Sequence, residues 1–188
     1  APRALAGKSA ALMLDAADAA PHEADVAYLD PPYNQHSYLG NYHVWESLVR
    51  WDKPAVYGVA CKREDCRDRR SSFNSRPNCG PALRRVLERV RSRTVILSFN
   101  DEGFVARDEL ELMLRAIGGE NATLRVIEND YPRYVGARIG IYNPRGEKVG
   151  AVGKLRNTEF IYVLTRDQRS PSPTLPINSM AFSSLTWR

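Results

Sequence analysis

The chain has 188 residues, of which 43% are hydrophobic and 26% are charged, and its net charge is +5. This length and composition suit one compact domain with a hydrophobic core. No run approaches the roughly 18 consecutive apolar residues of a membrane span, and no basic-then-apolar signal peptide opens the chain.

The first half of the chain is expected to hold two helices, a strand and a long basic loop. Pro31 must end the apolar run before it, because proline has no N–H to donate to a strand pair. Apolar residues at helical spacing follow, with Trp45 expected in the core. The expected elements are a strand at 26–29, a helix at about 36–50, a loop at 52–79 and a helix that opens at Gly80-Pro81.

The second half is expected to alternate strands with one helix. The helix places Leu110, Met113, Leu114 and Ile117 on one face. The expected elements are a strand at 94–99, a turn at 100–103, the helix ended by Gly118-Gly119, a strand at 123–127, a hairpin of 138–142 with 147–152, and a last strand at 159–164.

This order of elements predicts an α/β fold with a mostly parallel sheet and a C-terminal antiparallel hairpin. Ligands of such sheets bind at the carboxyl ends of the strands. Two such ends carry polar residues, at 30–33 and at 98–101. From Gln168 the chain turns rich in serine and proline, so we expect a catalytic part at 1–167 and a tail at 168–188.

The positive charge is concentrated in residues 52–93, which hold 12 of the 27 lysines and arginines but 5 of the 22 acids. Such a block suits a polyanion such as nucleic acid, or it is a solvated basic surface. Arg133 is a further candidate for a phosphate contact, or it lies on a solvated strand edge. The candidate phosphate contacts are Lys62, Arg63, Arg67, Arg69, Arg70 and Arg133.

The three cysteines do not suggest a disulfide framework, and an odd number suits a reducing compartment. Cys61, Cys66 and Cys79 are not at a standard zinc spacing and no nearby histidine completes a site, so we expect free thiols.

The stretch Asp30-Pro31-Pro32-Tyr33 after the first strand suggests a specific chemistry. An amino group on an aromatic ring is a poor nucleophile, because the ring delocalises its lone pair. The Asp30 carboxylate and the Pro31 carbonyl can each accept a hydrogen bond from one N–H of this amino group, and the two prolines set the direction of that carbonyl. Tyr33 can stack on a base that has left its duplex. The alternative is a Pro-Pro turn capped by polar residues.

This stretch resembles the catalytic signature of the bacterial DNA adenine-N6 methyltransferases, in their solitary and restriction-associated subclass. The resemblance extends from about Leu14 to Leu164. It includes residues 25–34 with Tyr38, Tyr42-His43 and Glu46, then Ser98-Phe99-Asn100-Asp101-Glu102-Gly103, Tyr134-Val135-Gly136 and Asn157-Thr158-Glu159-Phe160.

The resemblance implies a partial Rossmann-like methyltransferase fold, S-adenosylmethionine as the methyl donor and double-stranded DNA as the substrate. Asp15 matches the position that contacts the adenine of the donor, although it is equally a surface acid before a turn, and Asp18 is a weaker candidate. Asp30 also borders the donor. Asn34 and Tyr38 are candidates for the base pocket, with the core as the alternative for Tyr38. Methyl transfer from a sulfonium needs no metal. The resemblance also implies a cytoplasmic, nucleoid-associated protein.

The family has an amino-terminal half with a Phe-x-Gly-x-Gly loop that wraps the methionine end of the donor. Only 29 residues precede Asp30 here, the sole glycine among them is Gly7, and the chain starts without a methionine. We therefore expect the carboxy-terminal part of a methyltransferase, which would pair with its missing half or with itself. The alternatives are a non-catalytic DNA-binding remnant, a subunit of a split methyltransferase, and an enzyme for another planar amine such as RNA adenine or a protein amide.

Overall fold

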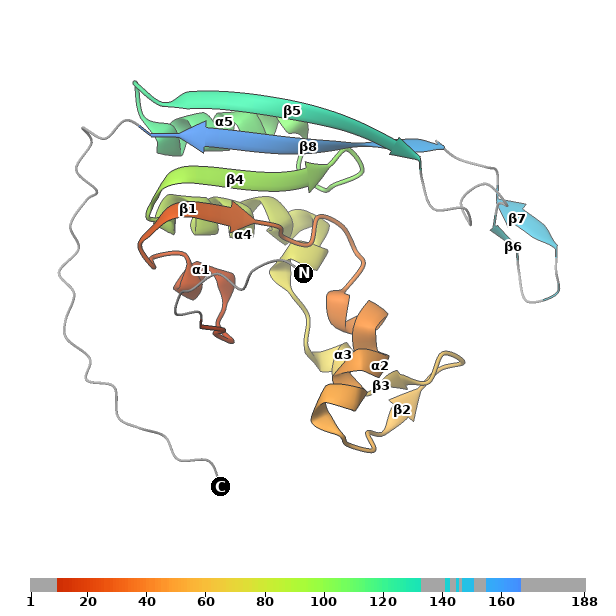
Figure 1. The fold of residues 1–188 in the computed structure, drawn as a ribbon. Helices are drawn as coiled ribbons and strands as arrows, with labels where there is room; N and C mark the ends of the chain where they lie inside the picture. The colour runs from red at the N-terminus through yellow and green to blue at the C-terminus, as the bar shows by residue number, and fades with distance from the viewer. Residues whose placement is uncertain (1–9, 133–140, 143–144, 146, 151–154, 167–188) are drawn as a thin grey trace, which may run out of the picture.

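A computed structural model of the chain describes residues 10–132, 141–142, 145, 147–150 and 155–166 (Figure 1). Its centre is a four-stranded sheet. The strands lie in the order β1 (Ala24–Leu29), β4 (Ser92–Asn100), β8 (Arg156–Thr165) and β5 (Thr123–Pro132). Each strand that the sequence predicted in these regions is present, and each is longer than predicted, β5 most of all.

The prediction of a mostly parallel sheet is wrong in its pairings. Strands β1 and β4 pair in parallel, but β8 inserts between β4 and β5 and runs antiparallel to both. The fold is therefore α/β with a mixed sheet. The sequence pattern predicted that the last strand exists but not which strands pair with it. Strand periodicity shows which residues share a face of the sheet, and it does not show which strand lies alongside.

One face of the sheet carries the hydrophobic core, covered by α4 (Arg76–Arg89) and α5 (Arg107–Gly118). Alternate residues of the two central strands point into this core, which also receives the apolar stripe of each helix. The fully buried side chains include Leu97 and Phe99 of β4, Tyr162 and Leu164 of β8, Leu83 and Leu87 of α4, and Leu110 and Leu114 of α5. The short α1 (Ala16–Ala19) packs its buried Ala17 against this core. We call the sheet with α1, α4 and α5 the sheet body.

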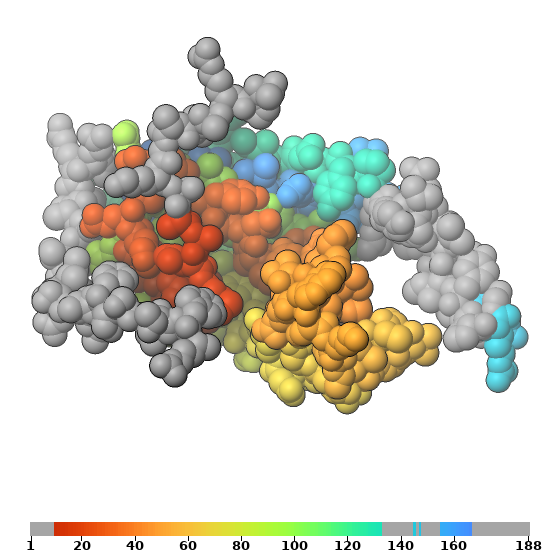
Figure 2. All heavy atoms as spheres, turned by 60° about the horizontal axis from the view of Figure 1, so that its bottom comes forward, coloured from red at the N-terminus to blue at the C-terminus, as the bar shows by residue number. Residues whose placement is uncertain are grey.

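Residues 38–74 leave the sheet body between β1 and α4, and we call them the excursion (Figures 1 and 2). The predicted helix of this region is present as α2, but the predicted loop at 52–79 is wrong, because short elements fill it. The elements are α2 (Tyr38–Arg50), β2 (Val56–Tyr57), β3 (Lys62–Arg63), α3 (Asp65–Asp68) and the 3-10 helix η1 (Ser72–Asn74). Strands β2 and β3 pair antiparallel.

The expected core position of Trp45 is also wrong, because its side chain is 64% exposed. Helix α2 buries none of its residues, although its apolar residues recur at helical spacing. The reason is its placement: α2 projects from the end of β1 and packs on β3 and α3 (Figure 1). An apolar stripe predicts a buried face only where a second layer covers it.

Helix α4 begins at Arg76, before the predicted opening at Gly80-Pro81. Pro77 already occupies the first turn, where the missing N–H of proline costs no intrahelical hydrogen bond. Pro81 then lies inside the helix. Helix α5 ends at Gly118-Gly119, as predicted.

The predicted terminal hairpin is confirmed as the antiparallel pair β6 (Ile141–Tyr142) and β7 (Lys148–Gly150). Arg133 and the predicted tail at 168–188 lie outside the described residues. Among the residues that the structure describes, no helix has the length and apolar character needed to cross a membrane.

Candidate active site

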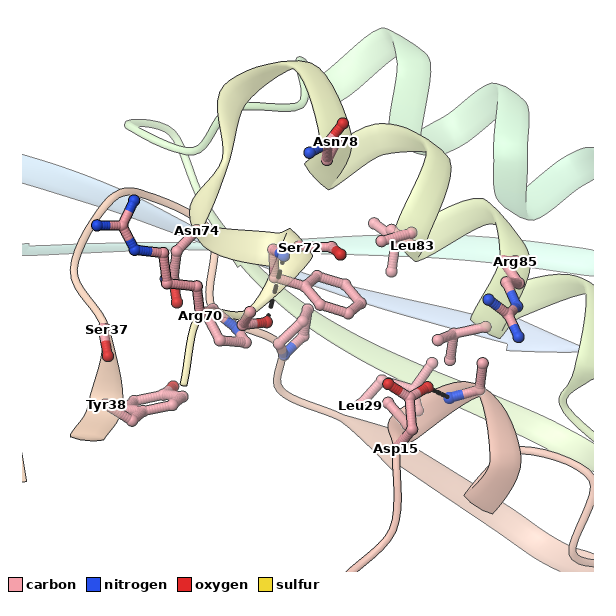
Figure 3. A pocket seen from close by; sticks show the side chains of 18 of the residues that line it. Asp15, Leu29, Ser37, Tyr38, Arg70, Ser72, Asn74, Asn78, Leu83 and Arg85 are labelled. Atoms are coloured by element: carbon pink, nitrogen blue, oxygen red, sulfur yellow. Dashed lines mark hydrogen bonds between the residues drawn. The ribbon is translucent and has the colours of Figure 1, made fainter. Parts of the chain in front are cut away.

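A cavity of about 960 Å³ lies between the sheet body and the excursion. The carboxyl end of β1 forms its floor, and α1, α4 and η1 supply its walls. Figure 3 shows Asp15 and Arg85 toward one end and Ser37, Tyr38 and Arg70 toward the other. The cavity therefore lies at a strand end, where the sequence placed the site.

Four of the predicted site residues from the first strand and its turn line this cavity together with Asp15. They are Asp30, Pro31, Pro32 and, after the turn, Tyr38. Asp30 is exposed to solvent, while the two prolines are half-buried. The Asp30 carboxylate stays at the edge of the cavity because the residue before it is fixed in the sheet. That residue is Leu29, the last of β1, which pairs with Leu97 of β4.

Asp15 caps a helix and also lines the cavity. Its carboxylate Oδ1 accepts a hydrogen bond of 2.9 Å from the backbone N–H of Ala17, so it caps α1. The same residue lines the cavity near Arg85 (Figure 3). Because its carboxylate caps the helix, Asp15 is held in a fixed orientation at the cavity.

Tyr33 does not line this cavity, and neither does Asn34. The Tyr33 ring packs edge-on against Phe99, with 5.8 Å between ring centroids. Its backbone carbonyl accepts a hydrogen bond of 2.8 Å from the N–H of Phe104. Burial, together with the nearby Tyr131, Tyr38 and Asp30, raises the pKa of Tyr33, so its phenol stays neutral at physiological pH. The Asp-Pro-Pro corner thus separates the cavity from Tyr33.

Tyr38 stands in the cavity wall with Tyr42 stacked behind it, at 6.3 Å between ring centroids. Burial and the nearby Asp30 carboxylate raise the pKa of Tyr38. An aromatic ring held beside a carboxylate in this way offers a flat, neutral surface next to a hydrogen-bond acceptor.

The loop after Tyr33 is tied down by side-chain hydrogen bonds. Asn34 Oδ1 accepts from the N–H of His36 at 2.9 Å, which is an Asx turn. Ser37 Oγ accepts from the N–H of Gly40 at 3.2 Å and caps α2. The side-chain amide of Asn74 donates to the carbonyls of Asn34, at 2.7 Å, and His36, at 3.1 Å. Asn74 also lines the cavity.

The predicted phosphate contact at Arg63 is corrected by its surroundings. Its side chain is only 3% exposed, and its guanidinium pairs with both Asp52 and Asp65. A further hydrogen bond of 3.1 Å runs to Ser47 Oγ of α2. These bonds lower the pKa of both carboxyls and raise that of Arg63. Arg63 therefore holds the excursion together rather than facing a phosphate.

The other predicted basic contacts remain on the surface of the excursion. Arg67 and Arg69 form exposed ion pairs with Glu64 and Glu46, and Arg67 also lies over the Tyr57 ring. Arg69 and Arg70 line the cavity, and Lys62 is half-buried in β3. Exposed pairs of this kind are weak, so they leave the arginines available to a phosphate.

The basic block itself divides unevenly. Residues 52–75 hold 6 lysines and arginines against 4 acids, whereas 76–93 hold 6 against 1. Most of the positive excess therefore belongs to α4 and the turn after it. Sequence charge alone could not show this, because it did not separate the excursion from the helix.

Several cavity residues escaped the sequence interpretation, namely Ser72, Phe73, Asn74, Asn78 and Arg85. The run Ser71-Ser72-Phe73-Asn74-Ser75 is rich in turn-forming residues, which is a signal for an ordered turn. No sequence signal shows that this turn lies beside the loop some forty residues earlier.

The cavity wall offers groups that suit part of S-adenosylmethionine, the donor that the resemblance implied. S-adenosylmethionine carries a cationic sulfonium, a flat adenine and donor N–H and O–H groups. The wall offers the carboxylates of Asp15 and Asp30 for the charge and the donors, and Leu29, Leu83 and Val86 for the flat ring. Among the described residues, no cluster of histidine, cysteine and acids could hold a metal ion, and Cys61, Cys66 and Cys79 are free.

Comparison with known proteins supports the family resemblance that the sequence suggested. Residues 9–92 match the family model of D12 class N6 adenine-specific DNA methyltransferases. This segment includes the Asp-Pro-Pro corner, the whole excursion and the whole of α4. The predicted resemblance to the DNA adenine-N6 methyltransferases is therefore confirmed.

Individual relatives agree with this match. The Type II methyltransferase M.FokI of Planomicrobium okeanokoites is 30% identical over 110 residues, which are 58% of this chain and 17% of that protein. Modification methylase StsI of Streptococcus sanguinis is 31% identical over 93 residues, 50% of this chain and 14% of its own length. The Type II methyltransferase M.NlaIII of Neisseria lactamica is 26% identical over 110 residues, which are 58% of this chain and 31% of that protein. The chain thus spans only a minor part of each relative. No solved structure matches significantly.

Proposed function

We propose, from the premise that residues 9–92 are a D12-class N6 adenine-specific DNA methyltransferase region, that this chain belongs to an enzyme that methylates adenine in DNA. The methyl donor is S-adenosylmethionine and the acceptor is the N6 amino group. The observation that carries the proposal is the single cavity that brings Asp15, Asp30, Pro31 and Tyr38 together at the end of β1.

In this proposal Asp15 and Asp30 border the donor, whose sulfonium supplies an electrophilic methyl group when it is bound. The Asp30 carboxylate and the Pro31 carbonyl each accept a hydrogen bond from one N–H of the adenine amino group. This draws electron density onto the nitrogen and aims its lone pair at the methyl carbon. The N–C bond would form as the S–C bond of the donor breaks, which would leave S-adenosylhomocysteine, and one amino proton would pass to the Asp30 carboxylate and on to solvent. Positioning and electrostatics carry the reaction, and no covalent enzyme intermediate is needed.

The target base has two aromatic neighbours at this corner. Tyr38 presents its ring from the cavity wall, while Tyr33 packs against Phe99 on the other side of the prolines. A base extruded from its duplex would enter between them, with Asn34 beside it. Both phenols stay neutral at physiological pH because their pKa values are raised, chiefly by burial. Neutral rings suit stacking on an uncharged base.

DNA would approach along the basic surface that adjoins the cavity. Arg69 and Arg70 of the excursion and Arg85 of α4 lie on the cavity rim. Lys62 and Arg67 extend this surface on the excursion, and Arg84 does so on α4. Arg63 is not part of it, because its guanidinium is held by Asp52 and Asp65.

The free edge of β1 supports the proposed association with further strands, which are either another part of the protein or a second copy. Among the described strands, β1 pairs with β4 alone. Its Val26 and Tyr28 are 52% and 62% exposed. An exposed strand edge with apolar side chains is a template for pairing. Such an addition would extend the sheet toward the Rossmann-like arrangement that the resemblance implies.

The test is methyl transfer from labelled donor to DNA by the full-length protein. Asp30→Ala is expected to lower kcat by about 100-fold or more, because the amino nitrogen loses an acceptor that acts in the transition state. Asp25→Ala is the matched control, since Asp25 is an exposed acid within β1, the strand that Asp30 follows. Equal rates for Asp30→Ala and Asp25→Ala would contradict the assigned chemistry.

A non-catalytic DNA-binding protein is the competing function, favoured by the basic excess of α4. It predicts salt-dependent DNA binding without donor binding. Calorimetric titration with S-adenosylmethionine separates the two, because saturable binding contradicts the non-catalytic alternative.

A further inference from the structure

Asn74 is the feature that the proposed function does not yet use. It lies in η1, at the end of the excursion, and its side chain reaches back across the chain to the loop that follows Tyr33. The amide Nδ2 donates to the carbonyl of Asn34 at 2.7 Å and to that of His36 at 3.1 Å. A single primary amide therefore uses both of its hydrogens on one short loop.

We infer that Asn74 is a positioning residue for methyl transfer, which clamps the loop between the Asp-Pro-Pro corner and α2. This inference rests on the proposed function for its catalytic consequence, although the clamp itself can be tested without activity. The substrate class that it serves is the extruded adenine, because the clamped loop joins the two tyrosines that flank the proposed base position.

The clamp completes an otherwise one-sided attachment of this loop. On the side of the sheet body, the N–H of Phe104 holds the carbonyl of Tyr33 at 2.8 Å. Beyond Tyr33, the loop's own bonds are local: the Asx turn from Asn34 to His36 and the Ser37 cap of α2. Local turns shape the loop but do not place it against the rest of the molecule. Asn74 supplies that longer connection.

The position of Asn74 also links two parts of the site. Helix α4 begins two residues after Asn74, and it forms one wall of the cavity. Tyr38 begins α2 one residue after the clamped loop, and it stands in the opposite wall (Figure 3). The clamp therefore sets the distance between the α4 wall and the Tyr38 ring. Misplacing a reacting group by about 1 Å can lower a rate by as much as 100-fold.

Two substitutions distinguish clamping from mere packing. Asn74→Asp keeps the size of the side chain but replaces the donor with a carboxylate that faces two carbonyl oxygens. Asn74→Ala removes the group and lets water reach the carbonyls. If Asn74 clamps the loop, Asn74→Asp is the more harmful change, because it adds repulsion to the loss of two hydrogen bonds. If Asn74 only fills space, the same-sized aspartate is the milder change.

The control is Asn41→Asp, which makes the same chemical change on an exposed residue of α2. The first measurement is hydrogen exchange of the full-length protein. We expect Asn74→Asp to accelerate exchange of peptides over residues 33–41 and to leave β4 unchanged, whereas Asn41→Asp changes neither. Unchanged exchange over 33–41 in Asn74→Asp would overturn the clamp, whether or not the protein methylates DNA.

The second measurement is steady-state methyl transfer with calorimetric donor binding. We expect Asn74→Asp to lower kcat by roughly 10- to 100-fold while the donor Kd changes little, because the loop positions the base rather than the donor. A loss confined to donor affinity, or a larger loss in Asn74→Ala than in Asn74→Asp, would contradict the positioning role. If the wild-type protein transfers no methyl group, the proposed function fails, and the exchange experiment still decides on the clamp.

Discussion

The sheet body and the excursion are held together by different interactions. Among the residues that the structure describes, the sheet body buries fifteen hydrophobic ones in one continuous core. In the excursion, by contrast, Arg63 is the only buried residue, and its partners are two carboxylates and a hydroxyl. One region is stabilised by apolar burial, which is cooperative and insensitive to charge. The other depends on a charged hydrogen-bond centre, so its order depends on protonation.

The two regions contribute different residues to the proposed site. The sheet body places Asp30 and the prolines at a rigid strand end. The excursion carries Tyr38, Arg69, Arg70 and Asn74 to the same cavity from a region with no apolar core. Regions with few buried apolar contacts open at lower free energy than cores do.

The largest expected effect is the loss of a core side chain from the sheet body. Leu97 is 0% exposed, so Leu97→Ala should lower the free energy of unfolding by about 2–5 kcal/mol, through lost burial and the cavity it leaves. Leu48, on α2, is 50% exposed, and Leu48→Ala should change the free energy of unfolding by no more than about 0.5 kcal/mol. Urea denaturation measures both. Similar losses would show that the excursion has a core after all.

Two glycines sharpen the same comparison with effects of opposite sign. A Cβ on Gly103 would collide with the ring of Phe99, which supports Tyr33. Gly103→Ala should therefore cost about 1–3 kcal/mol. A Cβ on Gly40, within α2, meets its nearest atoms in Ser37 at 3.7 Å, an ordinary contact. Gly40→Ala should stabilise by up to about 1 kcal/mol, since glycine disfavours helices. Thermal unfolding distinguishes them, and destabilisation by both would refute the contrast.

The smallest expected effects appear at the two extremes of pH. Hydrogen bonds from Arg63 hold the pKa values of Asp52 and Asp65 below their ordinary 3.8. Their contribution to stability is complete above that value and is lost as the pH falls through the lowered pKa values. The excursion should thus loosen first in acid. NMR of the β2–β3 amides follows this, and in Arg63→Met the acid step should disappear.

The sheet body should respond at the alkaline extreme instead. Burial raises the pKa of Tyr162 from 10.0 to about 12. Between these values the unfolded chain has released a proton that the folded chain still holds, so stability falls as the pH rises. Its hydroxyl lacks a hydrogen-bond partner among the described residues. Tyr162→Phe should therefore retain stability at neutral pH and reduce the alkaline loss, to which Tyr33 and Tyr38 also contribute, and thermal unfolding across pH would show this. An unchanged alkaline loss would contradict this.

Local pattern in the sequence predicted most elements and the place of the cavity at a strand end. Alternating and helical periodicity placed β1, β4, α5 and β8, because each reports a face that the sheet body buries. The Asp-Pro-Pro corner was visible because proline restricts the backbone whatever surrounds it. The same periodicity failed for Trp45, whose helix has no covering layer, and turn-rich sequence in the excursion concealed short elements.

What the sequence determined by itself was therefore the resemblance to a methyltransferase family, the acid and prolines at a strand end, and the one-sided core that holds this strand. Only the tertiary structure decided that β8 lies between β4 and β5, that Arg63 is an internal ion-pair centre, and that Asn74 meets the loop after Tyr33. The physical reason is distance along the chain. Neighbouring residues impose their conformation through sterics and local hydrogen bonds, whereas partners far apart in sequence are chosen by the packing of the whole fold.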